Sequence, residues 1–271
     1  MKEQLKVALV TGAASGIGAS VCSRLAADGY AIAAADSNEE GLKALAAQHE
    51  GSAGFIAHAL DVRDAEAQRH FVGVVESQLG PISAVVPCAG LTRSGPAETL
   101  SVSDWQLVIG VNLTGTFLTC QAAAERMLQR GSGAIVCIAS VSAKGGQAGR
   151  ANYSASKFAV AGLVKSLAIE WGARGIRVNA VSPGVVATPM VLKGVPEHFQ
   201  KIMLDRIPMK RFATPSDIAG AISMLLSSNA AYVNGSVLEI DGGMTAGYLT
   251  SKHGEDYATL SAINRIEPAA W

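Results

Sequence analysis

Short apolar runs alternate with longer amphipathic stretches along most of this chain. The first run covers residues 5–10, and only Lys6 interrupts it. A continuous run of this kind is typical of a strand that is covered on both faces. Further strands are predicted at residues 31–35, 54–60, 84–86, 134–139, 176–181 and 236–240.

Helical patterns separate these strands. They cover residues 16–27, 38–48, 65–78, 103–130, 153–173, 196–204 and 216–226, and the 103–130 stretch divides into two pieces near residues 110–112. Strands that alternate with helices of this length predict right-handed βαβ units and a parallel sheet. We therefore predict an α/β fold: a Rossmann-like, doubly wound sheet with helices on both faces, in a single domain over residues 1–245.

Residues 246–271 form a C-terminal extension with apolar side chains among charged ones. We predict that this extension packs on a neighbouring subunit near the mouth of the active site. The alternative is a mobile terminus.

Composition narrows the class of protein. Apolar residues make up 49% and charged residues 16%, which excludes a disordered chain. The 22 basic and 22 acidic residues balance, so no charge surplus favours nucleic acid or a membrane surface as a partner. No leader or long apolar span is evident, which predicts a cytoplasmic protein. Four cysteines without a C-x-x-C pair and five scattered histidines predict free thiols and no metal site.

A glycine-rich turn follows the first predicted strand. Residues 11–18 read T-G-A-A-S-G-I-G and open the first predicted helix. Gly12 permits a tight turn, Gly16 lets a pyrophosphate approach the backbone, and Gly18 lets the helix pack closely on the strand. Ser15 and Ile17 complete the candidate phosphate contacts at the helix N-terminus. The alternative is an ordinary glycine-rich turn. A kinase-type P-loop is excluded, because no Gly-Lys-Ser/Thr follows.

Two carboxylates end predicted strands. Asp36 lies 20 residues after Gly16, where a carboxylate binds the adenosine ribose and repels a 2′-phosphate, so we predict NAD as cofactor. The alternative is a solvated turn residue. Asp61 and Val62 follow the third predicted strand and could hold the adenine. Asp61 could equally be the N-cap of the next helix.

Tyr153 and Lys157 lie four residues apart on a strong helical pattern, which places them one turn apart on the same face. An ammonium near a phenol stabilises the phenolate and makes the phenol a usable base at neutral pH. This spacing alone favours an ordinary surface Tyr–Lys pair. The surrounding motifs reverse this preference.

The chain resembles the short-chain dehydrogenase/reductase family over residues 5–245. It matches the T-G-x-x-x-G-x-G turn, the Y-x-x-x-K pair, a serine 13 residues upstream of the tyrosine at Ser140, and the helix asparagine Asn112. It also matches Pro183-Gly184 after a strand, with Thr188 following, and the closing Asp241-Gly242-Gly243.

The resemblance implies roles for these residues. Tyr153 would be the general acid/base, and Lys157 would stabilise its phenolate form and bind the nicotinamide ribose. Ser140 would polarise the substrate oxygen, although it could also be a capping serine at the end of a strand. Asn112 would tether a water that links Lys157 to solvent, although it could also be a mid-helix kink residue. The remaining implied cofactor contacts are Ala89, Gly90, Pro183, Gly184, Val186 and Thr188.

One segment departs from the family pattern. The family usually has Asn-Asn-Ala-Gly after the fourth strand, whereas this chain has Pro87-Cys88-Ala89-Gly90. Pro87 lacks a backbone donor and Cys88 lacks the amide, so we expect a slightly altered strand edge without loss of activity.

The predicted activity is hydride transfer between NAD(H) and a secondary alcohol or ketone, such as a sugar, a polyol or a similar small carbinol. A 3-oxoacyl thioester reductase and a catalytically silent, cofactor-binding regulator are the alternatives. Residues 91–100, 142–150 and 185–210 are expected to contact the substrate. Arg93 and Arg150 could meet an acidic substrate or remain solvated. The resemblance also implies a homotetramer or homodimer built on helices 114–127 and 157–171.

Overall fold

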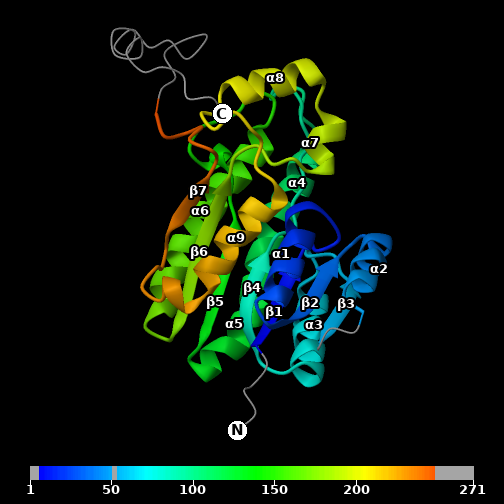
Figure 1. Cartoon of the computed structure of the whole chain (residues 1–271), viewed down its shortest axis with the longest axis vertical. Helices are drawn as coiled ribbons and strands as arrows, with labels where there is room; N and C mark the ends of the chain where they lie inside the picture. Colours follow the sequence, from blue (N-terminus) through cyan, green and yellow to red (C-terminus); the bar gives the residue numbers. More distant parts are fainter. Residues whose placement is uncertain (1–5, 51–53, 248–271) are drawn as a thin grey trace, which may run out of the picture.

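The computed structural model describes residues 6–50 and 54–247, and the extension from residue 248 onward lies outside them. A seven-stranded sheet runs through the middle of this part, with every paired strand parallel and the order β3-β2-β1-β4-β5-β6-β7 (Figure 1). The strands are β1 (Lys6–Thr11), β2 (Tyr30–Asp36), β3 (Phe55–Ala59), β4 (Ile82–Pro87), β5 (Gly133–Ile138), β6 (Ile176–Pro183) and β7 (Val237–Ile240).

β1 shows why the predicted strands are apolar on both faces. Val7 and Leu9 belong to one buried cluster, whereas Ala8 and Val10 belong to the cluster on the opposite face. Successive side chains of a strand point to opposite faces, so a sheet that is covered on both sides needs a continuous apolar run.

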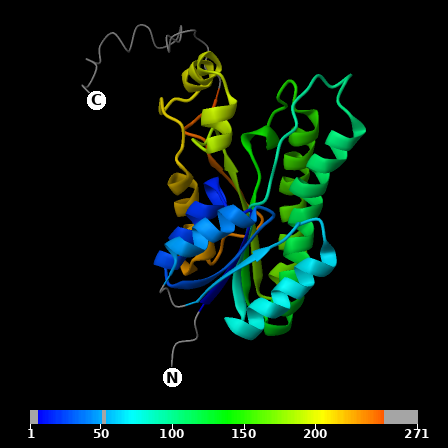
Figure 2. The same cartoon turned by 90° about the vertical axis from the view of Figure 1, so that its right-hand side faces the viewer.

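Helices form a layer on each face of the sheet (Figure 2). The first layer contains α1 (Gly16–Ala27), α2 (Glu39–Gln48) and α9 (Pro215–Leu226), and the second contains α3 (Ala65–Gln78), α5 (Thr116–Arg130) and α6 (Ala151–Gly172). α4 (Val102–Ile109) precedes α5 and contacts α6. α7 (Pro189–Gly194) and α8 (Glu197–Asp205) follow β6 and lie beyond the carboxyl ends of the strands (Figure 1).

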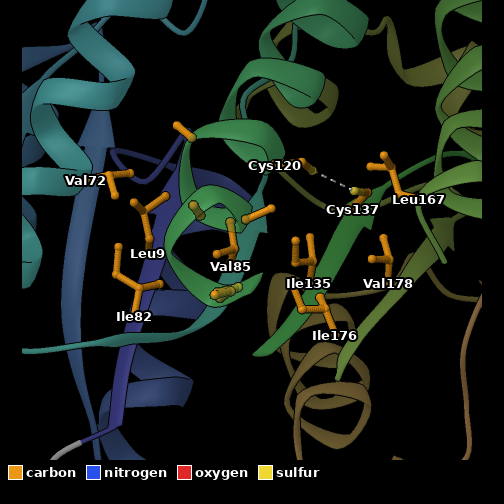
Figure 3. Close-up of a cluster of buried hydrophobic side chains, with 14 of the residues drawn as sticks. Leu9, Val72, Ile82, Val85, Cys120, Ile135, Cys137, Leu167, Ile176 and Val178 are labelled. Atoms are coloured by element: carbon orange, nitrogen blue, oxygen red, sulfur yellow. Dashed lines mark hydrogen bonds between the residues drawn. The ribbon is translucent and has the colours of Figure 1, made fainter. Parts of the chain in front are cut away.

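The core on the α5–α6 face is drawn in Figure 3, where strand side chains such as Leu9, Ile135 and Val178 meet helix side chains. Cys120 of α5 and Cys137 of β5 face each other there, with 3.8 Å between the two Sγ atoms. Both thiols are buried, and the cysteines of the chain are free, as the sequence predicted.

The predicted sheet, helices and fold class are confirmed, with element ends that differ by one or two residues. The predicted break near residues 110–112 is a π-helix, Gly110–Gly115, between α4 and α5. The short helix α7 was not predicted, although Thr188 followed by Pro189 is a typical helix start.

The stretch Val102–Arg130 is long and apolar enough to cross a membrane by length and composition, within the residues that the structure describes. Half of its most apolar window is buried inside the protein. Because its buried side chains pack against the sheet, the stretch has the character of a core helix.

Candidate active site

A cavity of about 1220 Å³ opens at the carboxyl ends of the strands. It includes the ends of β1 and β4, where the strand order reverses, which is where open α/β sheets bind their ligands. The predicted site residues that line it are Gly12, Ser15, Gly16, Ile17, Gly18, Asp36, Asp61, Val62, Ala89, Gly90, Ser140, Tyr153, Lys157, Pro183, Gly184, Val186 and Thr188. Asn112 does not line it and lies behind the wall.

The glycine turn is confined by backbone atoms. Gly12 has a φ of +65°, and a Cβ there would lie 2.6 Å from the Cα of Ala89. A Cβ on Gly18 would lie 2.0 Å from the carbonyl oxygen of Gly12. Glycine is therefore required at both positions, since a side chain would displace the turn from β4 or from the start of α1.

The start of α1 fits a phosphate group. Ser15 is the N-cap residue, but its hydroxyl makes no bond to its own helix and lines the cavity. The first backbone N–H groups of a helix have no partner within the helix, and they carry the positive end of its dipole. Gly16 adds no side chain at this end, and Gly18 lets α1 start close to the turn, so the turn fits a dinucleotide pyrophosphate.

Asp36 is anchored to the same turn. Its carboxylate accepts hydrogen bonds from the backbone N–H of Ala14 at 3.0 Å and of Asn38 at 2.9 Å. Each carboxylate oxygen keeps further acceptor capacity, and Asp36 lines the cavity. The side chain is thus fixed in position and still able to accept ribose hydroxyls.

Asp61 does not cap a helix. The N-cap of α3 is Asp64, whose carboxylate accepts from the backbone of Glu66 and Ala67. Asp61 instead forms an ion pair with Arg63, and this hydrogen bond lowers the pKa of the Asp61 carboxyl. The N-cap alternative for Asp61 is therefore wrong. Its carboxylate lines the cavity already paired with a cation.

Pro87 and Cys88 leave the strand edge toward β1 intact, whereas the pairing with β5 stops before Pro87. β4 pairs with β1 through Pro87, and the backbone N–H of Cys88 donates to Thr11 at 3.2 Å. Successive backbone donors of a strand alternate between its neighbours, so the donor that Pro87 lacks would face β5, where the pairing ends at Val85. Burial raises the pKa of the Cys88 thiol to about 12, which keeps it protonated.

Tyr153, Lys157 and Ser140 converge on the other part of the cavity. The Lys157 Nζ lies 5.7 Å from the centre of the Tyr153 ring and donates to the carbonyl of Ile138 at 2.8 Å. Ser140 is buried at the end of β5, and its Oγ accepts from the backbone N–H of Ser142 at 3.1 Å. Its hydroxyl proton can thus be directed to a ligand.

Asn112 is fully buried in the π-helix and fastens two walls of the cavity. Its Oδ1 accepts from the backbone N–H of Leu91, and its Nδ2 donates to the Leu91 carbonyl at 3.0 Å and to the Ser156 Oγ at 3.1 Å. Ser156 in turn donates to the carbonyl of Tyr153. π-helical segments within longer helices are frequent at functional sites. The π-helix interrupts the helical stretch at Asn112, the position that the sequence analysis considered as a possible kink.

Other lining residues were not predicted. Leu107 and Val111 come from α4 and the π-helix, and Met244 and Thr245 come from the turn after β7. The Asp241 carboxylate accepts from the N–H of Gly243 and from both the N–H and the hydroxyl of Thr245. An Asp-Gly-Gly sequence is typical of such a turn, so the sequence could have predicted the turn that carries Met244 and Thr245.

Comparison with known proteins places the chain among oxidoreductases. A family model described as enoyl-(acyl carrier protein) reductase matches residues 12–245. D-threitol dehydrogenase of Mycolicibacterium smegmatis is 48% identical over 243 residues, which cover 89% of this chain and 93% of that protein. The 3-oxoacyl-[acyl-carrier-protein] reductase of Thermotoga maritima is 39% identical over 245 residues. These residues cover 90% of this chain and 99% of that protein.

Solved structures agree with this placement. Levodione reductase superposes with a TM-score of 0.85 at 34% identity, covering 90% of this chain and 98% of that one. A Beutenbergia cavernae protein described as a gluconate 5-dehydrogenase, with NADP at low occupancy, has a TM-score of 0.83 at 36% identity, covering 89% of this chain and 97% of the other. The chain is therefore an NAD(P)-dependent oxidoreductase and belongs to the short-chain dehydrogenase/reductase family.

Proposed function

We propose that the protein oxidises a secondary alcohol of a sugar or polyol with NAD, with Tyr153 as the general base. The observation that carries this proposal is the placement of Tyr153, Lys157 and Ser140 in the same cavity as the glycine turn. The similarity to D-threitol dehydrogenase supports a polyol as the substrate class.

The glycine turn, Asp36 and the 183–188 segment would hold the cofactor. Asp36 favours NAD, because a carboxylate at this point repels the 2′-phosphate of NADP. The nicotinamide, when bound, supplies the acceptor for the hydride of the carbinol carbon. Asp61, Val62, Ala89 and Gly90 would enclose the adenosine, and Val186 and Thr188 would orient the carboxamide.

Side chains of the protein transfer the hydroxyl proton of the substrate and stabilise charge on its oxygen. The Lys157 ammonium stabilises the phenolate form of Tyr153, and this phenolate removes the hydroxyl proton of the alcohol and becomes the neutral phenol. Ser140 donates a hydrogen bond to the substrate oxygen as negative charge develops there, and it keeps its own proton. In the reverse direction, Tyr153 returns the proton to the nascent alkoxide.

The test is a screen of alcohols, polyols, sugars and hydroxyacyl compounds with NAD and NADP. Each reaction is monitored by the absorbance of the reduced cofactor. We expect NAD-dependent polyol oxidation, and a Tyr153→Phe variant should lower kcat by about 10²- to 10⁴-fold while still binding NAD. A clear preference for NADP, with reduction of 3-oxoacyl thioesters, would favour the second candidate, which the Thermotoga maritima relative supports. Activity unchanged in Tyr153→Phe would remove this residue from the mechanism.

A homotetramer or homodimer in the cytoplasm is part of the proposal. Ala122, Ala123 and Ala124 are buried within the subunit, so they serve core packing. Phe117 on α5 and Phe158 and Ile169 on α6 remain exposed, which suits a helix-to-helix contact between subunits. Free thiols fit a reducing compartment. A monomer in light scattering at micromolar concentration would contradict the assembly.

A further inference from the structure

Arg150 lines the cavity beside the catalytic tyrosine without an acidic partner. Its guanidinium carbon lies 5.8 Å from the centre of the Tyr153 ring, and the side chain is half-buried. Among residues 6–50 and 54–247, no carboxylate forms an ion pair with it. Arg206, which follows α8, lines the same cavity and is likewise unpaired within that part of the chain.

Two other arginines show the contrast. Arg63 lines the cavity but is bound to Asp61. Arg93, which sequence alone placed on an equal footing with Arg150, lies 3.7 Å from Asp104 and does not line the cavity. Of these four arginines, the two without an acidic partner in the described residues, Arg150 and Arg206, are the two on the substrate side of the cavity.

The carboxylates of the cavity lie at its other end. Asp36 and Asp61 are the acidic side chains that line it within the described residues, and both belong to the cofactor end. Besides Arg150, the cavity wall contains Val141 and Ser142, and α7 and α8 add apolar side chains such as Val191 and Phe199. An apolar wall reduces the screening of charge, so an unpaired guanidinium there attracts an anion more strongly than a solvated one.

We infer that the substrate carries an anionic group, a carboxylate or a phosphate ester, which Arg150 binds while the carbinol reaches Tyr153. This inference rests on the proposed function and specifies the sugar or polyol substrate as an anionic derivative, a sugar acid or a polyol phosphate. A planar guanidinium suits either group, because it can donate two parallel hydrogen bonds to a carboxylate or a phosphate.

The experiment compares three substrates of equal chain length: a polyol, the corresponding aldonic acid and the corresponding polyol phosphate. The kcat/KM with NAD is measured for wild type, Arg150→Gln, Arg150→Lys and the control Arg93→Gln. We expect wild type to prefer one of the anionic substrates. Arg150→Gln should reduce the ratio of anionic to neutral kcat/KM by about ten- to hundredfold, and Arg150→Lys by less. Arg93→Gln should leave the ratio as in wild type.

The aldonic acid and phosphate arms identify which anion is preferred. Oxidation of neutral polyols with no advantage for either anion, or an equal loss on all substrates in Arg150→Gln, would overturn the inference while leaving the proposed function intact. If no carbinol is oxidised, the proposed function fails, and the melting temperature of the enzyme–NAD complex decides the anion site. Stabilisation by the aldonic acid or by the polyol phosphate that is lost in Arg150→Gln supports the site, and no stabilisation by either compound refutes it.

Discussion

At the cofactor end of the cavity, backbone atoms surround the glycine turn closely, whereas at the substrate end α8 presents side chains that pack loosely. A Cβ on Gly18 would lie 2.0 Å from the Gly12 carbonyl oxygen. None of the residues of α8 is buried, and Phe199 and Ile202 are 52% and 53% exposed although both line the cavity. The cofactor end is formed by backbone at the ends of the strands and the start of α1. The substrate end is partly formed by α8, which has no buried residue.

This difference matches the two ligands, because the cofactor is common to many enzymes and the substrate is specific to each one. A dinucleotide is the same molecule in every enzyme that uses it, so its site can be built into strand ends and a helix start. Substrates differ, and the segments that contact them can vary without disturbing the sheet. A change at the cofactor end should therefore affect folding and cofactor binding together. A change at the substrate end should affect specificity alone.

The largest effect is expected from Gly18→Ala. The added methyl group collides with the Gly12 carbonyl, so we expect a loss of about 3 kcal/mol in the free energy of unfolding and a loss of NAD binding. Urea unfolding and calorimetric NAD titration measure the two quantities.

Gly73→Ala in α3 is the matched control, because a Cβ there meets no atom within 4 Å. It should stabilise the protein by about 0.5–1 kcal/mol, since alanine favours a helix. A Gly18→Ala protein that folds and binds NAD like wild type would show that the turn is not confined as described.

The same contrast explains which features the sequence could predict. The sheet follows from continuous apolar runs, and the glycine turn from three glycines between a strand and a helix, so both depend on neighbours in sequence. The role of Asp61 depends on a competition between two nearby carboxylates, Asp61 and Asp64, at one strand-to-helix junction. Both are acceptable N-cap residues, and the predicted helix start at residue 65 favours Asp64. The ion pair between Asp61 and Arg63 is the part that the sequence did not reveal.

Contacts distant in sequence were harder still. Asn112 binds Leu91, 21 residues away, from a buried position within the π-helix. Arg93 and Arg150 looked equivalent until the structure placed Asp104 beside the first. Such pairings depend on how loops and helices pack at the substrate end, and no local pattern encodes them.

A smaller effect on stability and kinetics is expected from Ser156→Ala, which lies between the two ends of the cavity. Ser156 links Asn112, and through it the Leu91 wall, to the backbone of Tyr153. Its loss should raise the KM for the alcohol about tenfold with little change in the KM for NAD, and cost about 1 kcal/mol of stability. Steady-state kinetics with each substrate varied in turn separates the two KM values.

Ser154→Ala is the control for this variant, because the Ser154 Oγ is buried on the same helix without a hydrogen-bond partner in the described structure. Removing an unpaired hydroxyl should change stability by no more than about 0.5 kcal/mol and leave the KM for the alcohol as it is. Equal effects in both variants would mean that Ser156 only fills space.

The smallest effect is expected from Cys88→Asn, which restores the family's usual amide at the cofactor end. The bond that fixes this position joins the backbone N–H of Cys88 to Thr11, and any side chain keeps it. We therefore expect NAD affinity to change by no more than about twofold, which corresponds to roughly 0.4 kcal/mol. Calorimetric titration of both proteins provides the comparison. A tenfold change would mean that this end is held by side chains as well as by backbone, and the contrast between the two ends would then be one of degree.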